Sequence, residues 1–182
     1  MKKNVLYILR LSLTLLLITA LAAAALAWVN GITKDAIAEN RLAKTRQALV
    51  EVLPGAESMA VIDNGSGIVK AVYAPSADSP VQGWAVEVAP GSGFGGEIRM
   101  MVGIDANGKV TGISIITHAE TPGLGAVADA ATPAGESFRG SFVGDSGNLT
   151  LNDIDALSGA TITSKAVLEG VNAALAYVAK LG

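Results

Sequence analysis

The stretch RMMVGIDANGKVTGISIIT, residues 99–117, decides the fold of this chain. Its two halves, residues 99–105 and 109–117, are rich in apolar and β-branched residues, which favour strands. The tripeptide Ala-Asn-Gly separates them, and an Asn-Gly pair between two apolar runs is a strong signal for a tight hairpin turn. Residues 99–117 therefore predict two antiparallel strands.

Further strands precede this hairpin. Residues 59–63 and 68–73 flank the turn-forming cluster NGSG, which predicts a second hairpin, and residues 84–88 alternate between apolar and other side chains. No long helical pattern separates these strands, so an antiparallel sheet is favoured over a doubly wound parallel one. The predicted fold class is α+β: an N-terminal transmembrane helix, then a mainly antiparallel sheet domain flanked by helices.

Two helices are predicted around the sheet. Residues 32–53 form a stalk helix with Thr33 as its N-cap, and Pro54-Gly55 ends it. Residues 164–180 form the last helix, with apolar side chains at helical spacing. The Gly-, Ala-, Asp- and Ser-rich stretch between residues 117 and 161 is expected to be irregular and functional.

The N-terminal segment indicates a membrane anchor. Residues 11–29 carry no charge and are long enough, as a helix, to cross the hydrocarbon core of a bilayer. Lys2, Lys3 and Arg10 precede them, so the N-terminus is expected in the cytoplasm and the remaining chain outside the cell membrane. A cleaved signal peptide is the alternative, because residues 23–27 offer small-residue cleavage sites. We therefore expect a leader and anchor at 1–30, a stalk at 31–54 and an extracytoplasmic domain at 55–182.

The composition excludes several kinds of chemistry. The chain has 182 residues, no cysteine and one histidine, which excludes disulfides, iron–sulfur clusters, thiolate zinc sites and multi-histidine metal centres. The formal net charge is −3, and all 16 acidic residues follow the anchor, which argues against nucleic acid as a partner. Any redox reaction here would use an organic cofactor.

The segment DALSGATITS, residues 155–164, is the most informative about chemistry. Four hydroxyl side chains surround two small residues, which allow a ligand to approach closely; the six are Ser158, Gly159, Ala160, Thr161, Thr163 and Ser164. The segment leads into the predicted last helix, whose N-terminus favours a phosphate group. The alternative is a Ser/Thr-rich turn in which Thr163 or Ser164 caps the helix.

Two glycine-containing loops are weaker signals. THAETPGLG, residues 117–125, follows a strand and presents Glu120 and Thr121, although it also suits an ordinary Pro-Gly turn. His118 is expected to make structural hydrogen bonds and not to transfer protons. GSGFGGE, residues 91–97, lacks the Lys-Ser/Thr ending of a P-loop and leads into a strand, so we interpret it as a flexible turn near a cofactor site.

Two of these segments resemble a known family. DALSGATIT resembles the flavinylation signature of the FMN-binding domain family, in which an Asp precedes Ser/Thr-Gly-Ala-Thr. GGEIRMMVGIDANGKVTGISIITHAETPGLG resembles the second hallmark block, as found in the G subunits of Rnf complexes, which are ion-translocating ferredoxin:NAD oxidoreductases of bacterial membranes. The C subunit of the sodium-translocating NADH:quinone reductase shares the domain but is typically longer. Glu97 departs from the pattern, since relatives often carry a small or aromatic residue there.

The resemblance implies a covalently bound FMN. Its phosphate would be esterified to Thr161 by a separate flavin transferase that recognises Asp155. The remaining cofactor contacts implied are Ser158, Gly159, Ala160, Thr163, Glu120, Thr121, Gly123, Leu124 and Gly125. The chain would then be an electron-relay subunit of an oxidoreductase that translocates ions, with other membrane and redox subunits as partners. It would have no catalytic residue, metal ligand or substrate site of its own. The rival hypotheses are a membrane-anchored FMN-binding sensory module and an exported structural protein.

Overall fold

The computed structural model describes residues 2–55, 58–76, 79 and 81–181. The chain divides into two units, Met1–Leu42 and Ala43–Gly182, which are described separately. The first unit is part of a single helix, α1, which runs from Lys2 to Val52. The second unit contains the end of α1 and all of the strands.

Helix α1 carries the apolar segment that was predicted to be an anchor. Large apolar side chains between Tyr7 and Val29 are exposed, and α1 is the one helix in the described residues that is long and apolar enough to cross a membrane. The expected helix start at Thr33 is wrong, because α1 is continuous there. The Thr33 hydroxyl lies inside the helix and donates to the carbonyl oxygen of Val29 at 2.8 Å. A Thr hydroxyl can make this bond to the preceding turn without ending a helix.

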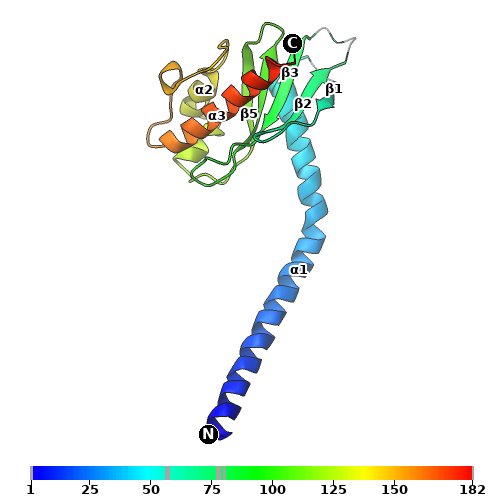
Figure 1. Cartoon of the computed structure of the whole chain (residues 1–182), viewed down its shortest axis with the longest axis vertical. Coiled ribbons are helices and arrows are strands. Elements are labelled where there is room, and N and C mark those ends of the chain that lie inside the picture. The colour runs from blue at the N-terminus through cyan, green and yellow to red at the C-terminus, as the bar shows by residue number, and fades with distance from the viewer. Residues whose placement is uncertain (1, 56–57, 77–78, 80, 182) are drawn as a thin grey trace. The chain divides into compact units, whose positions relative to one another are not determined.

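The domain is built on a five-stranded antiparallel sheet (Figure 1). Its strands follow chain order, so every neighbouring pair is joined by a short connection or hairpin. Their bounds are β1 Met59–Asp63, β2 Val69–Pro75, β3 Gly83–Val88, β4 Arg99–Asp105 and β5 Val110–Thr117. All five predicted strands and the α+β class are confirmed, with strand ends that differ from the prediction by two residues at most.

The β4–β5 hairpin forms as the Asn-Gly signal predicted. Val102 pairs with Ile113, and Gly108 adopts a positive φ of 75° in the turn, a conformation that glycine accepts without strain. The Asp105 carboxylate accepts hydrogen bonds from the backbone N–H groups of Lys109, at 2.9 Å, and Asn107, at 2.8 Å. The bond from Lys109 is the largest cause of a lowered pKa at Asp105.

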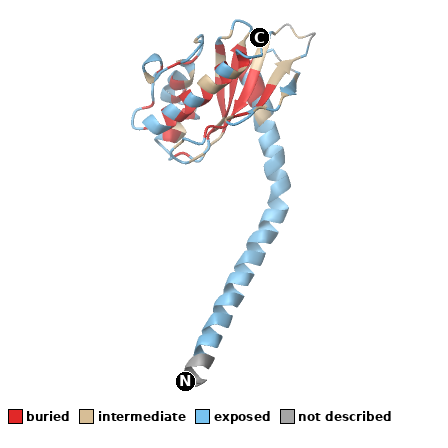
Figure 2. Cartoon of the chain, viewed as in Figure 1, coloured by how far each residue is buried: buried red, intermediate tan, exposed pale blue. Residues whose placement is uncertain are grey.

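One face of the sheet is covered by α2, Pro133–Gly140, and α3, Thr161–Val178 (Figure 2). Alternate residues of β4 point to this side, where Met100 and Val102 lie in the same core as Val167 and Val171 of α3. Helix α2 lies within the stretch between residues 117 and 161, so the expectation that this stretch is irregular is wrong there. Its start is nonetheless encoded locally, since Pro133 is its first residue and the side chain of the N-cap, Thr132, accepts from the N–H of Gly135 at 3.3 Å.

The other face is covered by the end of α1. Leu49 and Val52 pack in a second core with Met101 and Ile116, whose side chains point away from α3. The Thr111 hydroxyl donates to the carbonyl oxygen of Val52 at 2.5 Å. The end of the predicted stalk is therefore part of the domain core, a role that was not predicted from the sequence.

Candidate functional site

The informative segment forms the start of α3, three residues earlier than predicted. Helix α3 begins at Thr161, and its N-cap is Ala160, so no side chain caps it. The alternative in which Thr163 or Ser164 is the N-cap is therefore wrong. The Ser164 hydroxyl lies inside the helix, where it donates to the carbonyl oxygen of Ala160 at 3.1 Å and accepts from the N–H of Leu157 at 3.0 Å.

The turn before α3 depends on a glycine. Gly159 has a φ of 74°, in the left-handed region where a side chain would be strained. The turn brings Ala160 and Thr161 to the edge of an open cleft. The first N–H groups of an α-helix lack partners within the helix, and here no side chain satisfies them. This arrangement suits a phosphate group at the rim of the cleft.

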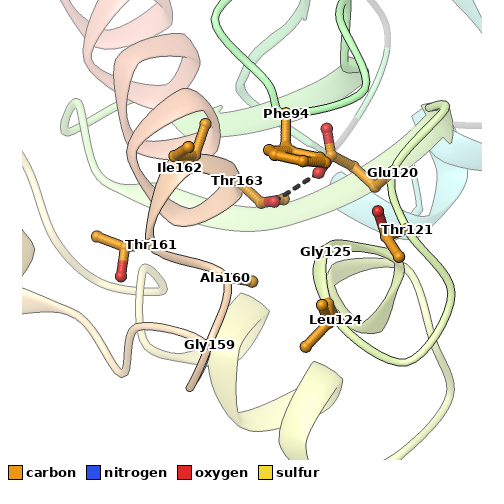
Figure 3. A pocket seen from close by; sticks show the side chains of 10 residues that line it. All are labelled: Phe94, Glu120, Thr121, Leu124, Gly125, Gly159, Ala160, Thr161, Ile162 and Thr163. Atoms are coloured by element: carbon orange, nitrogen blue, oxygen red, sulfur yellow. Dashed lines mark hydrogen bonds between the residues drawn. The ribbon is translucent and has the colours of Figure 1, made fainter.

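The cleft has a volume of about 300 Å³ and is built from three segments (Figure 3). They are the glycine-rich loop between β3 and β4, the segment after β5 that continues into the short 3₁₀ helix Gly125–Ala128, and the start of α3. The lining residues are Phe94, Glu120, Thr121, Leu124, Gly125, Gly159, Ala160, Thr161, Ile162 and Thr163. The structure thus brings together segments that are separate in the sequence.

Most of the predicted cofactor contacts line this cleft, and three predicted site residues do not. Ser158 and Gly123 are exposed neighbours of lining residues. Asp155 is exposed, and its carboxylate accepts a hydrogen bond from the hydroxyl of Ser137 on α2 at 2.9 Å. Asp155 therefore lies at the surface near the start of α3, where a second protein can reach it.

Two apolar residues of the cleft were not predicted from the sequence. Phe94 is 70 % exposed and Ile162 is 50 % exposed, and together with Leu124, at 48 %, they give the cleft apolar walls. Exposed apolar side chains gathered around an open cleft are typical of a ligand site. Phe94 is the only large apolar residue in GSGFGG, and this was the signal available in the sequence.

The floor of the cleft is a buried hydrogen bond between Glu120 and Thr163 (Figure 3). The Thr163 hydroxyl donates to Glu120 Oε2 at 2.6 Å, and the N–H of Gly95 donates to Glu120 Oε1 at 2.9 Å. Glu120 is only 6 % exposed and Thr163 only 2 %. The Thr163 hydroxyl, which we expected to contact the cofactor, thus donates its hydrogen bond to Glu120.

His118 makes local contacts. Its Nδ1 accepts from the N–H of Glu120 at 3.1 Å, and its Nε2 lies 3.8 Å from Asp129 Oδ2. Partial burial raises the pKa of Asp129, and the neighbouring His118 opposes this shift. Glu97, the residue that departs from the family pattern, is paired with Arg99 at 3.1 Å and does not line the cleft.

The residues present fit an FMN. Apolar walls suit a planar ring, the uncapped start of α3 suits a phosphate, and the exposed Thr161 side chain lies at the first position of that helix. The described part of the chain contains no group of three His, Cys, Asp or Glu side chains that could hold a metal ion.

Comparison with known proteins agrees with this fit. Residues 93–176 match the FMN-binding domain family, and residues 1–52 match the RnfG N-terminal region. The chain is 38 % identical to the G subunit of the Na⁺-translocating ferredoxin:NAD⁺ oxidoreductase complex of Acetobacterium woodii, over 90 % of this chain and 87 % of that one.

Two further relatives are named as the G subunits of ion-translocating oxidoreductase complexes. The protein of Methanosarcina acetivorans is 33 % identical over 91 % of both chains. That of Shewanella amazonensis is 32 % identical over 85 % of this chain and 80 % of its own. The chain therefore belongs to the RnfG family, the G subunits of ion-translocating oxidoreductase complexes, and contains an FMN-binding domain.

Proposed function

We propose that this chain is the electron-relay flavoprotein subunit of a membrane-bound, ion-translocating ferredoxin:NAD oxidoreductase of the Rnf type. The observation that carries the proposal is the apolar cleft at the uncapped start of α3, which lies within the region matched by the FMN-binding domain family. The names of the relatives supply the complex in which such a flavin would work. Other membrane and redox subunits of that complex are the expected partners.

The flavin is attached to Thr161 through its phosphate, as a phosphoester. The burial of the four hydroxyls supports this choice, because Thr163 and Ser164 are both buried and hydrogen-bonded. Ser158 and Thr161 are exposed, and of these two only Thr161 lines the cleft. A phosphate on Thr161 would also lie at the positive end of the α3 dipole.

A separate flavin transferase makes this bond. A Thr hydroxyl is a weak nucleophile unless a base activates it, and among the described residues no side chain hydrogen-bonds to Thr161. The single histidine is held by Glu120, in another part of the site. The exposed Asp155 gives the transferase a recognition point six positions before the acceptor.

The bound flavin would supply the redox chemistry, and the chain's residues would orient it and exclude water from part of it. The apolar side chains of Phe94, Leu124 and Ile162, which line the cleft, would contact the ring, and Glu120 and Thr121 would supply polar groups. A covalent bond keeps the flavin at a high local concentration outside the cytoplasm, where a dissociated cofactor would be diluted.

The anchor remains attached, with residues 11–29 across the cell membrane, the N-terminus in the cytoplasm and the domain outside. The exposed apolar surface of α1 and the preceding Lys2, Lys3 and Arg10 support this topology. Intact-mass measurement of the purified protein should find residues 1–30 present. A mature protein that begins near Ala27 and is released from membranes by salt would contradict it.

Peptide mass spectrometry tests the attachment site. Trypsin should release residues 140–165 from the native protein with an FMN-sized addition on Thr161. Thr161→Ala should lose the flavin and still fold, at a cost of at most about 0.5 kcal/mol because Thr161 is exposed and is not the N-cap, whereas Thr161→Ser should retain some flavin. An unmodified peptide from cells that contain the transferase would refute covalent attachment. Copurification with redox membrane subunits would separate the relay role from that of an isolated binding module.

A further inference from the structure

Glu120 is the one acidic side chain among the described residues that line the cleft, and it is almost fully buried. Both of its carboxylate oxygens accept hydrogen bonds, Oε2 from the hydroxyl of Thr163 and Oε1 from the N–H of Gly95. An ionised carboxylate is an acceptor at both oxygens, which matches these two donors. In the part of the chain that the structure describes, no Lys, Arg or His forms an ion pair with Glu120.

Three glycines make room for this carboxylate. A Cβ on Gly93 would lie 2.7 Å from Glu120 Oε1, and a Cβ on Gly125 would overlap Glu120 Oε2 and the Thr163 hydroxyl. At Gly95 a Cβ would overlap the carbonyl of Ala119, directly before Glu120. The chain thus omits side chains at three positions around Glu120, which leaves its carboxylate held at the floor of the cleft.

We propose that Glu120 lowers the reduction potential of the flavin held in this cleft, through the negative charge of its carboxylate. The inference rests on the proposed function. Reduction adds two electrons, which enter the complex from reduced ferredoxin, and the accompanying protons come from solvent. Until it is balanced by protons, the added negative charge is repelled by Glu120, so the oxidised flavin is favoured. The apolar walls reduce screening of this repulsion by water.

Glu120→Gln removes the charge and preserves the shape. A Gln amide can accept from the N–H of Gly95 with its oxygen and donate to the Thr163 hydroxyl oxygen with its nitrogen, so both contacts have replacements. A unit charge that lies about 10–12 Å from the added electrons changes the reduction equilibrium about tenfold, when the effective dielectric constant is about 20. A tenfold change in a two-electron couple corresponds to about 30 mV.

The test is a spectroelectrochemical titration of the full-length, detergent-solubilised holoprotein. The midpoint potential of Glu120→Gln should rise by about 30 mV or more, the shift that a tenfold change in the equilibrium gives. The matched control is Glu136→Gln, which removes the same charge from the exposed surface of α2 and should leave the potential unchanged. Thr163→Val removes a hydrogen bond but keeps the carboxylate, so it should not raise the potential. If Glu120 acted only by holding the shape of the site, both Glu120→Gln and Thr163→Val would raise the midpoint potential.

The outcomes distinguish this inference from the proposed function. The mass of the wild-type peptide 140–165 is measured first, and a wild-type protein without flavin overturns both proposals. A flavin-bearing wild type with an unchanged potential in Glu120→Gln overturns this inference alone, as does a folded Glu120→Gln that fails to hold flavin. If Glu120→Gln does not fold, Ile162→Lys adds a positive charge to an exposed wall of the cleft and should raise the potential. An unchanged potential there overturns the inference.

Discussion

Replacing Thr163 by Val isolates the hydrogen bond at the floor of the cleft. The two side chains have nearly the same shape, so the change leaves no cavity and removes only the hydroxyl that donates to Glu120 at 2.6 Å. Both residues are buried, and Glu120 keeps its bond from the N–H of Gly95. A hydrogen bond to a charged group contributes about 1.5–3 kcal/mol, and we expect the free energy of unfolding to fall by about that amount.

Thermal unfolding of the full-length apoprotein, followed by circular dichroism, measures this loss. In a domain of this size, 1 kcal/mol lowers the melting temperature by about 2–4 °C, so Thr163→Val should melt about 3–12 °C lower. Thr161→Val is the matched control, because Thr161 is exposed and its change should cost at most about 0.5 kcal/mol. In a Glu120→Gln background the cost of Thr163→Val should shrink. Equal losses at both threonines, or an unchanged cost in that background, would refute the reasoning.

Three further predictions concern other parts of the domain. Gly103→Ala should destabilise the domain by about 1–3 kcal/mol, because a Cβ there would overlap the carbonyl of Val52. Urea unfolding measures this loss. Gly31→Ala is the control and should not destabilise the domain, because a Cβ at Gly31 would meet nothing within 4 Å. Burial, and after it the carboxylate of Glu87, raise the pKa of Tyr73 to about 12 from 10.0. The stability that its neutral phenol contributes is therefore complete below pH 10 and is lost as the pH rises through about 12. In Tyr73→Phe, the free energy of unfolding should fall less steeply with pH across that window. His118→Gln should leave the flavin attached and preserve most electron transfer by the complex, and complete loss of turnover with flavin still bound would show a catalytic role.

The strands were predictable because their signals are local. β1 and β4 have the predicted bounds, and the Asn-Gly pair marks the β4–β5 turn. Helix α2 was missed because eight residues are too few for a clear helical period, although Thr132-Pro133 marks its start. The docking of the α1 end was not predictable in this way, because it depends on glycines in β4 and β5 that let the helix approach the sheet.

The part of the candidate site that lies within a sequence motif was predictable. The signature singled out Thr161, and the structure places that residue at the cleft. The Glu120–Thr163 bond joins residues 43 positions apart, and no sequence pattern pairs them. Phe94 and Ile162 become cleft walls only because the glycine-rich loop and the first turn of α3 meet in the folded domain.

The burial of the α1 end affects where the protein can be shortened for structural work. A soluble fragment that begins after Pro54 would lack Leu49 and Val52 and would present the apolar side chains of Met101 and Ile116 to water. Such a patch promotes aggregation. A fragment cut at residue 93, where the family match begins, would also lose β1, β2 and β3. Starting at Ala43 removes the apolar anchor and keeps both faces of the sheet covered.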